Sequence, residues 1–352
     1  MSNEPTLVIL IPGFPEDKND STCLPAQQNL ILHINQQFPS VKLLILAFQY
    51  PFQKKEYYWN GNKVIAFGGK NKGAFARRFL WYRVSKKLNK LKKENNITGV
   101  LSFWAGECGL IGKKWADKNG VKHYCWLMGQ DAKKENNYIR KSGFKGNELI
   151  AISDFIQEEV SKHHGLVPVH TIPLGVSAQP VSTAKRNIDI ICAGSLIPLK
   201  QYHIAIEAGL EFKKEFPHFR MMICGRGPEK ERLAGLINAH GLTENILLAG
   251  EKEHEELLSL MRQSKLLLHT SSFEGLGLVC LEALAAGTPV ISFTQPMKQT
   301  ICNWHIVDSP GAMIKKASFL LRAEQGHEPA CSFTMKDTAK ELMRLFGSGS
   351  TR

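Results

Sequence analysis

The sequence lacks several features that would assign it to a membrane, secreted or metal-binding class. None of its apolar runs approaches the ~20 residues that a transmembrane helix needs. The first four residues are polar and have neither the basic stretch nor the small-residue cleavage site of a signal peptide. The eight cysteines form no C-x-x-C pair, and the twelve histidines form no H-x-x-x-H pattern. We therefore expect a cytoplasmic protein with reduced thiols, no bound metal and no other cofactor.

Two glycine-containing segments are similar to nucleotide-binding motifs but fail at the positions that matter. Around Gly112, a phosphate loop would need glycine at position 107 and serine or threonine at position 114, where Glu107 and Lys114 stand. The turn 225–229 (GRGPE) lacks the last glycine of a dinucleotide fingerprint. The sequence therefore argues against a nucleoside triphosphatase and against a Rossmann dehydrogenase.

The charge is positive and unevenly distributed. The formal net charge is +13, and residues 1–180 hold 25 Lys and Arg against 14 Asp and Glu, whereas residues 181–352 hold 20 against 18. A basic first half favours a polyanionic partner or an anionic membrane surface. We expect no nucleic-acid partner.

Short apolar runs alternate with helical patterns along the whole chain, which predicts parallel sheets covered by helices. A chain of 352 residues is long for one core, so two domains are expected. The expected strands cover 6–11, 42–48, 63–67, 100–103, 123–127, 187–193, 221–224, 247–250, 266–269 and 289–292. The expected helices cover 25–38, 77–93, 108–119, 202–216, 254–263, 278–286, 317–321 and 335–346.

The basic segment Arg77–Lys93 allows two interpretations. Its leucines and valine at positions 80, 84, 88 and 91 form one apolar stripe, and Phe79 and Tyr82 lie off that stripe among the cations. Such a helix can lie on anionic lipid. It can equally cover a sheet and expose its basic face to water, because an expected strand follows it directly.

The stretch 271–292 (SSFEGLGLVCLEALAAGTPVIS) has the most specific pattern in the chain. It predicts a loop after a buried strand, a helix that Gly287 caps and Pro289 ends, and a further strand. The loop lies at the carboxyl end of a strand, where open α/β sheets bind ligands. Its glycines allow close backbone approach, and Glu274 and Glu282 are suited to accept hydrogen bonds from sugar or ribose hydroxyls.

This stretch resembles the E-x7-E signature of retaining GT-B glycosyltransferases of family 4. The resemblance implies two Rossmann-like domains with parallel sheets that face a central cleft. It implies that Glu274 faces the donor sugar and that Glu282 holds the ribose of the nucleotide. It also implies that Gly275, Leu276, Gly277 and Leu278 offer backbone amides to the donor diphosphate.

Other segments resemble the same family in part. The segment 194–200 (GSLIPLK) is similar to the family motif G-R-L-x-x-x-K, which implies diphosphate contacts for Gly194, Ser195 and Lys200, although Ser195 replaces the arginine. Gly225 and Arg226 lie in a turn similar to the one that the family places near the nucleobase.

The first half resembles the family more weakly. Met128-Gly129-Gln130-Asp131 is similar to the family's H-G-x-D, with methionine in place of histidine. Asp131 would orient a sugar hydroxyl or cap the following helix, and these two roles stay open. Gly13 ends the first strand where a phosphate-facing turn can lie. The catalytic candidates are thus Lys200, Glu274 and Asp131.

From these patterns we predict an acceptor-side domain over 1–180, a linker over 181–187 and a donor-binding domain over 188–330. Residues 331–352 are predicted to form a helix that crosses back to the first domain, followed by a flexible tail. The predicted function is retaining transfer of a sugar from a nucleoside-diphosphate sugar to an acceptor hydroxyl. A glycan or lipid-linked acceptor of cell-envelope synthesis is favoured, with attachment to the inner face of the membrane through Arg77–Lys93. The alternatives are a GT-B nucleotide-sugar epimerase or hydrolase, and a nucleotide-sugar-binding protein without catalysis.

Overall fold

The computed structural model describes residues 2–180, 186–323 and 328–347 and divides the chain into two compact units. The first unit consists of Met1–Leu174 and Met335–Arg352, and the second of Gly175–Thr334. The division therefore falls before the predicted linker 181–187, of which residues 181–185 lie outside the described residues. In the predicted tail, residues 348–352 also lie outside them.

The first unit is built on an eight-stranded sheet with the order β3-β4-β2-β1-β5-β6-β7-β8. Every neighbouring pair is parallel except β3 and β4. The strands are β1 (Ser2–Gly13), β2 (Lys42–Tyr50), β3 (Lys55–Trp59), β4 (Asn62–Ala66), β5 (Asn95–Phe103), β6 (Lys122–Leu127), β7 (Leu149–Ala151) and β8 (His170–Thr171). The antiparallel pairing of β3 with β4 is an exception to the parallel pairing that the sequence predicts. Asn60 and Gly61 both have positive φ, and an Asn-Gly pair is a strong hairpin signal that the sequence analysis missed.

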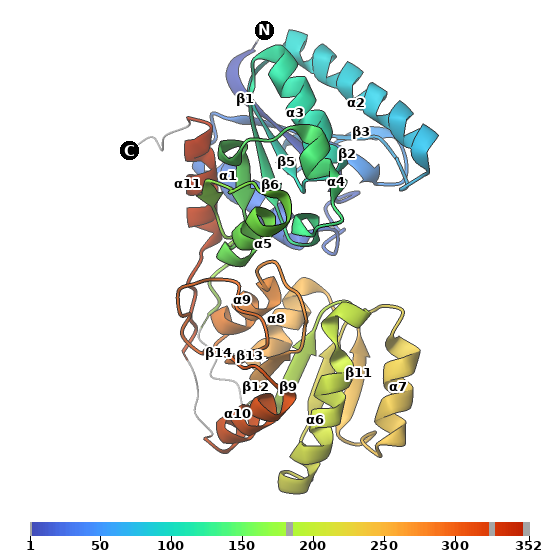
Figure 1. Cartoon of the computed structure of the whole chain (residues 1–352), viewed down its shortest axis with the longest axis vertical. Coiled ribbons are helices and arrows are strands. Elements are labelled where there is room, and N and C mark those ends of the chain that lie inside the picture. The colour runs from blue at the N-terminus through green and yellow to red at the C-terminus, as the bar shows by residue number, and fades with distance from the viewer. Residues whose placement is uncertain (1, 181–185, 324–327, 348–352) are drawn as a thin grey trace. The chain divides into compact units, whose positions relative to one another are not determined.

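Helices cover both faces of this sheet (Figure 1). On one face, apolar residues of β1 and β2 form a core with α2 and α3. On the other side, α1 packs against α11, which follows the second unit in sequence but belongs to the first. The helices of this unit are α1 (Pro25–Gln37), α2 (Ala74–Glu94), α3 (Glu107–Asn119), α4 (Asn137–Ser142), α5 (Asp154–His164) and α11 (Met335–Leu345), with the 3₁₀ turns η1 (Gln130–Ala132) and η2 (Gly146–Glu148).

The basic helix α2 covers the sheet. Its apolar stripe is buried in the core of the first unit, as the 3.6-residue periodicity predicts. The opposite side remains in solvent, where Phe75, Phe79 and Tyr82 are 87%, 62% and 62% exposed. The apolar stripe therefore packs in the core of the first unit, and only the outer side of α2 remains available to a partner.

The second unit has a parallel six-stranded sheet with the order β11-β10-β9-β12-β13-β14. Its strands are β9 (Ile188–Ala193), β10 (Met221–Cys224), β11 (Ile246–Gly250), β12 (Ser264–His269), β13 (Val290–Ser292) and β14 (Trp304–Ile306). Its helices are η3 (Pro198–Lys200), α6 (Tyr202–Glu215), α7 (Lys230–Ala239), α8 (His254–Arg262), α9 (Leu278–Ala285) and α10 (Pro310–Arg322). Helices α6, α7 and α10 pack on the apolar core of the sheet, and α8 packs against α9, β9 and β12.

One helix of this unit is longer than predicted. The sequence pattern predicts only 317–321, but α10 begins at Pro310. The Ser309 side chain accepts a hydrogen bond from the Ala312 N–H at 3.3 Å, and Pro310 occupies the first turn, so the helix has a proper N-cap. Within the described residues, no helix has the length and apolar character needed to span a bilayer.

Candidate functional site

The predicted site residues of the second unit lie in loops at the carboxyl ends of its parallel strands. Hydrogen bonds tie the loop after β9 to the loop after β12. The Thr270 hydroxyl donates to the Lys200 carbonyl at 2.7 Å, and the Ser272 N–H donates to the Leu199 carbonyl at 3.0 Å. These bonds bring Lys200 beside Glu274, although the two residues are far apart in sequence.

Lys200 and Glu274 form a close ion pair that a buried histidine completes. The Lys200 Nζ lies 2.5 Å from Glu274 Oε2, and the His269 Nε2 lies 3.2 Å from the same oxygen. Burial alone would raise the pKa of Glu274, but the hydrogen bond from His269 and the charge of Lys200 outweigh it and lower that pKa to about 2. Burial lowers the pKa of His269. The neutral imidazole therefore donates through Nε2 and holds a permanently ionised Glu274 in place.

The helix that follows this loop begins with uncapped backbone amides. Gly277 is the N-cap of α9 in the left-handed conformation (φ 72°), and no side chain caps the helix. A Cβ at this position would lie 3.3 Å from the Trp304 ring, so a larger residue would be both strained and crowded. Free amides at a helix N-terminus attract anions. Leu276, just before this glycine, is buried.

Glu282, on the second turn of α9, is held by a histidine from the neighbouring helix. The His254 Nε2 donates to Glu282 Oε1 at 2.8 Å. This hydrogen bond raises the pKa of His254 above its ordinary value, because it outweighs burial, which lowers that pKa. Oε1 is thus bound, and Oε2 has no hydrogen-bond partner among the described residues. One oxygen of Glu282 is free to accept a ligand hydroxyl.

Gly194 and Gly225 allow two loops to meet backbone to backbone. The Gly194 N–H donates to the Cys224 carbonyl at 3.0 Å, and the Gly225 Cα lies so close to Gly194 that a Cβ would lie 1.9 Å from its carbonyl oxygen. Ser195, which follows Gly194 in the sequence, is exposed. Arg226 is 78% exposed and pairs with Glu251 at 3.1 Å, so no contact joins its side chain to the Lys200–Glu274 pair.

The two site candidates of the first unit, Asp131 and Gly13, lie where backbone N–H groups form hydrogen bonds. Asp131 Oδ1 accepts from the N–H groups of Gly129 at 2.8 Å and Met128 at 3.1 Å, and its Oδ2 accepts from the Ala105 N–H at 2.9 Å. The structure shows a third role beside the two left open, in which Asp131 holds two loops together, and a catalytic role stays a prediction. Gly13 ends β1, where the Phe14 N–H donates to the Tyr50 carbonyl.

Sequence reasoning missed the two histidines that orient the acids. His269 precedes Glu274 by five residues at the end of a strand, and His254 begins α8. Neither belongs to a His motif, and only the packing of α8 against α9 brings His254 to Glu282. No group of three or more potential metal ligands occurs in the described parts of the chain.

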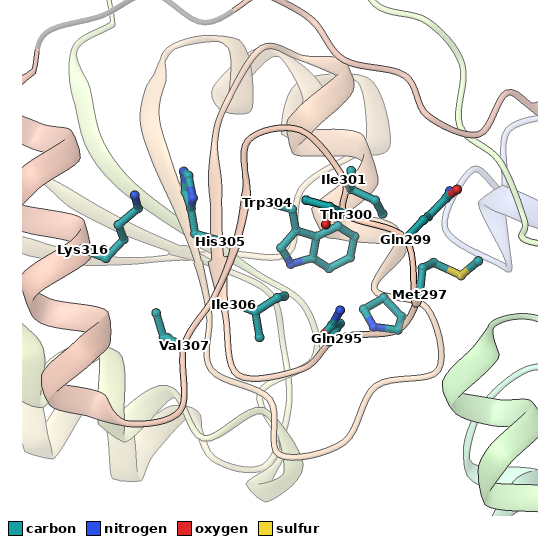
Figure 2. Close-up of a pocket in the computed structure, with 11 residues that line it drawn as sticks. Gln295, Met297, Gln299, Thr300, Ile301, Trp304, His305, Ile306, Val307 and Lys316 are labelled. Atoms are coloured by element: carbon teal, nitrogen blue, oxygen red, sulfur yellow. The ribbon is translucent and has the colours of Figure 1, made fainter.

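A separate pocket of about 460 Å³ lies in the second unit between the segment 295–301, β14 and α10. Figure 2 shows the Trp304 ring in its wall, with Lys316 extending from the neighbouring helix. None of the predicted site residues lines it. Trp304 connects it to the candidate site, because its ring lies against Gly277 and its indole N–H donates to the Ser292 hydroxyl at 2.8 Å.

The arrangement in the second unit suits a ligand with both negative charge and hydroxyl groups. Lys200 and the start of α9 favour an anion, and Glu274 and Glu282 are fixed acceptors for hydroxyls. Comparison with known proteins points to such a class. Residues 177–318, most of the second unit, match the family model described as glycosyl transferases group 1. The second unit is therefore similar to glycosyl transferases of group 1.

Two curated relatives each match part of the chain. The GtfA subunit of the UDP-N-acetylglucosamine–peptide N-acetylglucosaminyltransferase of Streptococcus pneumoniae is 31% identical over 147 residues, 41% of this chain and 29% of the relative. A glycogen synthase of Mycobacterium tuberculosis is 27% identical over 182 residues, 49% of this chain and 43% of the relative. The chain thus matches less than half the length of either relative.

Solved structures extend the similarity to the whole fold. Anabaena HepE, solved in complex with UDP and glucose, has a TM-score of 0.68 at 15% identity and covers 97% of this chain and 99% of its own. The two Rossmann-like units, one with an eight-stranded and one with a six-stranded sheet, are those of the GT-B fold. The predicted fold class is confirmed.

Proposed function

We propose that this protein transfers a hexose from a nucleoside-diphosphate sugar to an acceptor hydroxyl with retention at the anomeric carbon, as family 4 enzymes do. The observation that carries the proposal is the cluster of Lys200, Glu274 and His269 beside the uncapped start of α9. The match of residues 177–318 to group 1 glycosyltransferases supports it.

The chemistry follows from where charge develops. When the bond between sugar and diphosphate breaks, the departing phosphate gains negative charge and the sugar becomes cation-like. Lys200 and the α9 amides would stabilise the phosphate, and preorganised charges of this kind are usually the largest catalytic contribution. Glu274 would bind the sugar, and Glu282 would accept from the ribose. Gly194, Ser195, Gly225 and Arg226 would border the nucleotide.

We propose that Glu274 orients the sugar and does not act as a nucleophile. Lys200 and His269 both bind its Oε2, and its pKa is lowered to about 2, so the carboxylate is weakly basic and a weak nucleophile. We therefore propose same-face substitution, in which the leaving phosphate receives the acceptor proton. The cations already present make a metal ion and any other cofactor unnecessary in this proposal.

For the acceptor we propose a glycan or lipid-linked glycan of cell-envelope synthesis, reached by a cytoplasmic protein at the inner face of the membrane. The outer side of α2 supports this, because it combines exposed Phe75, Phe79 and Tyr82 with lysines and arginines. Each cation near anionic lipid contributes about 1 kcal/mol, which would give salt-sensitive attachment. Co-sedimentation with anionic and neutral vesicles tests this part, and equal retention by both would refute it.

The central test is donor binding followed by turnover. Nucleoside diphosphates of uracil, guanine and adenine should be compared for thermal stabilisation, because a ligand that binds only the folded state raises apparent stability. The matching nucleotide-sugars are then supplied with and without an acceptor panel. Release of nucleotide only with acceptor supports transfer. Consumption of the donor without acceptor would indicate the epimerase or hydrolase alternative, and binding without turnover would indicate a non-catalytic protein.

A further inference from the structure

A second cluster of polar side chains lies in the first unit and includes none of the predicted site residues. Glu107 begins α3 shortly after β5, and Gln49 lies near the end of β2. Arg77 and Trp81 lie on the first two turns of α2, and Tyr138 on α4. Four segments far apart in sequence thus contribute to one place near the carboxyl end of the sheet, where parallel α/β sheets bind ligands.

Glu107 is oriented through one of its oxygens only. The Gln49 Nε2 donates to Glu107 Oε2 at 3.1 Å, and the Trp81 indole N–H donates to the same oxygen at 3.0 Å. The Gln49 amide is itself fixed, because its oxygen accepts from the Asn71 N–H at 2.8 Å. The side chains of Gln49 and Trp81 therefore position the Glu107 carboxylate.

The groups around the other oxygen lack hydrogen bonds. Glu107 Oε1 has only the Arg77 Nε at 3.8 Å, which is beyond hydrogen-bonding distance. Among the described residues, neither the Arg77 guanidinium nor the Tyr138 hydroxyl has a hydrogen-bond partner. Glu107 is only 18% exposed. Oε1 still reaches solvent, so a carboxylate that is fixed through Oε2 keeps its other oxygen accessible to a ligand.

Tyr138 lies close enough to respond to both charges. Its pKa is raised by burial and, to a smaller extent, by the charge of Glu107, whereas Arg77 lowers it. The Glu107 acceptor and the Arg77 donor thus lie side by side, and Tyr138 lies on α4, which packs against α3. Trp81 adds an aromatic ring, over which the Arg77 guanidinium lies at 5.9 Å from the centroid.

The backbone beside this cluster is strained. Trp104, three residues before Glu107, has φ of 63°, and a bulky residue with positive φ is a genuine outlier. Such conformations cost about 1–3 kcal/mol and concentrate at binding and catalytic sites. Ala105, the residue after Trp104, donates its N–H to Asp131, and this hydrogen bond stabilises the strained turn.

We propose that this cluster binds hydroxyl groups of a sugar ring and is the acceptor-sugar site of the first unit. The inference rests on the proposed function for the identity of the ligand as acceptor. A carboxylate oxygen accepts from hydroxyls, a guanidinium donates to them, and an indole ring packs on the apolar face of a pyranose. A phosphate is disfavoured because Glu107 would repel it.

The test is saturation-transfer NMR on the full chain in the presence of UDP. The probes are the methyl α-glycosides of glucose, galactose, mannose and N-acetylglucosamine. In Glu107→Gln the amide oxygen can still accept from Gln49 and Trp81, so an NH₂ group replaces Oε1 and can no longer accept from a hydroxyl. Arg77→Met removes the cation. Arg78→Met removes the same charge from an exposed neighbour outside the cluster and serves as the matched control.

We expect at least one glycoside to bind the wild type and to lose about tenfold in affinity in Glu107→Gln and Arg77→Met, with Arg78→Met unchanged. Circular dichroism verifies folding, and the exposed Arg77 variant keeps the test valid if Glu107→Gln does not fold. Glycoside binding that is unchanged in both variants, absent in the wild type, or lost only in Glu274→Gln overturns the proposal. UDP signals in the same spectra report the proposed donor function separately.

Discussion

Each unit has a carboxylate in a loop that follows a buried parallel strand, and the two carboxylates are held by different kinds of partner. In the second unit, Glu274 is bound by the side chains of Lys200 and His269. In the first, Asp131 accepts from three backbone N–H groups. The Lys200 side chain can also reach a ligand, whereas the backbone N–H groups bound to Asp131 are fixed by their loops. We therefore predict a chemical role for Glu274 and a supporting role for Asp131.

The largest effect is expected for Lys200→Met. Its charge matters most as the phosphate departs, so turnover should fall by about 10²–10³-fold, as for other preorganised electrostatic groups. Nucleotide affinity should change much less. Lys213→Met, which removes a charge from exposed α6, is the control. Full turnover in Lys200→Met, measured with the donor identified by thermal shift, would remove Lys200 from the mechanism.

For Asp131→Ala we expect a loss of stability rather than a specific loss of chemistry. Three backbone N–H groups lose their acceptor, and each orphaned group costs about 1–3 kcal/mol if water does not replace the bond. Chemical denaturation should show the loss, with UDP affinity of the folded protein retained. If instead Asp131→Asn keeps its stability and loses turnover, Asp131 is catalytic and the contrast between the two units fails.

Glu282→Ala tests the ribose contact. Hydrogen bonds to a charged acceptor contribute about 1.5–3 kcal/mol, so affinity for the preferred nucleoside diphosphate should fall by a corresponding factor in calorimetry. Glu256→Ala, on the exposed side of the neighbouring α8, should bind like the wild type. Undiminished binding by a folded Glu282→Ala protein would show that the ribose lies elsewhere.

The smallest effect concerns pH and His254. Its pKa is raised in the folded protein, mainly by the hydrogen bond to Glu282. The protonated form is therefore stabilised by folding, and this contribution is complete below the ordinary pKa of histidine and lost as pH rises through the raised value. His254→Gln should flatten the dependence of unfolding free energy on pH in that window, whereas His218→Gln, at an exposed histidine, should leave it unchanged. Glu255 and Glu282 are the acids whose charges act on His254. If the unfolding free energy of His254→Gln depends on pH as steeply as that of the wild type, another group causes the dependence.

The sequence by itself determined the α/β class, the two-domain organisation and the loop that contains Glu274. These follow from local patterns, because strand and helix periodicities and the glycines and proline of 271–292 act on neighbouring residues. The apolar stripe of α2 was predictable for the same reason. The hairpin at Asn60-Gly61 had a local signal as well, but the sequence analysis did not use it.

Only the tertiary structure decided which polar groups meet. Lys200 reaches Glu274 because Thr270 and Ser272 bind the backbone of the loop before α6, and His254 reaches Glu282 because α8 packs on α9. The cluster at Glu107 depends on segments from four places in the chain. Such contacts join residues whose separation in sequence carries no periodic signal, and their energies depend on burial and exact partners. A single sequence therefore predicts the strands and loops in which these residues lie. Which residues they contact is decided by the tertiary structure.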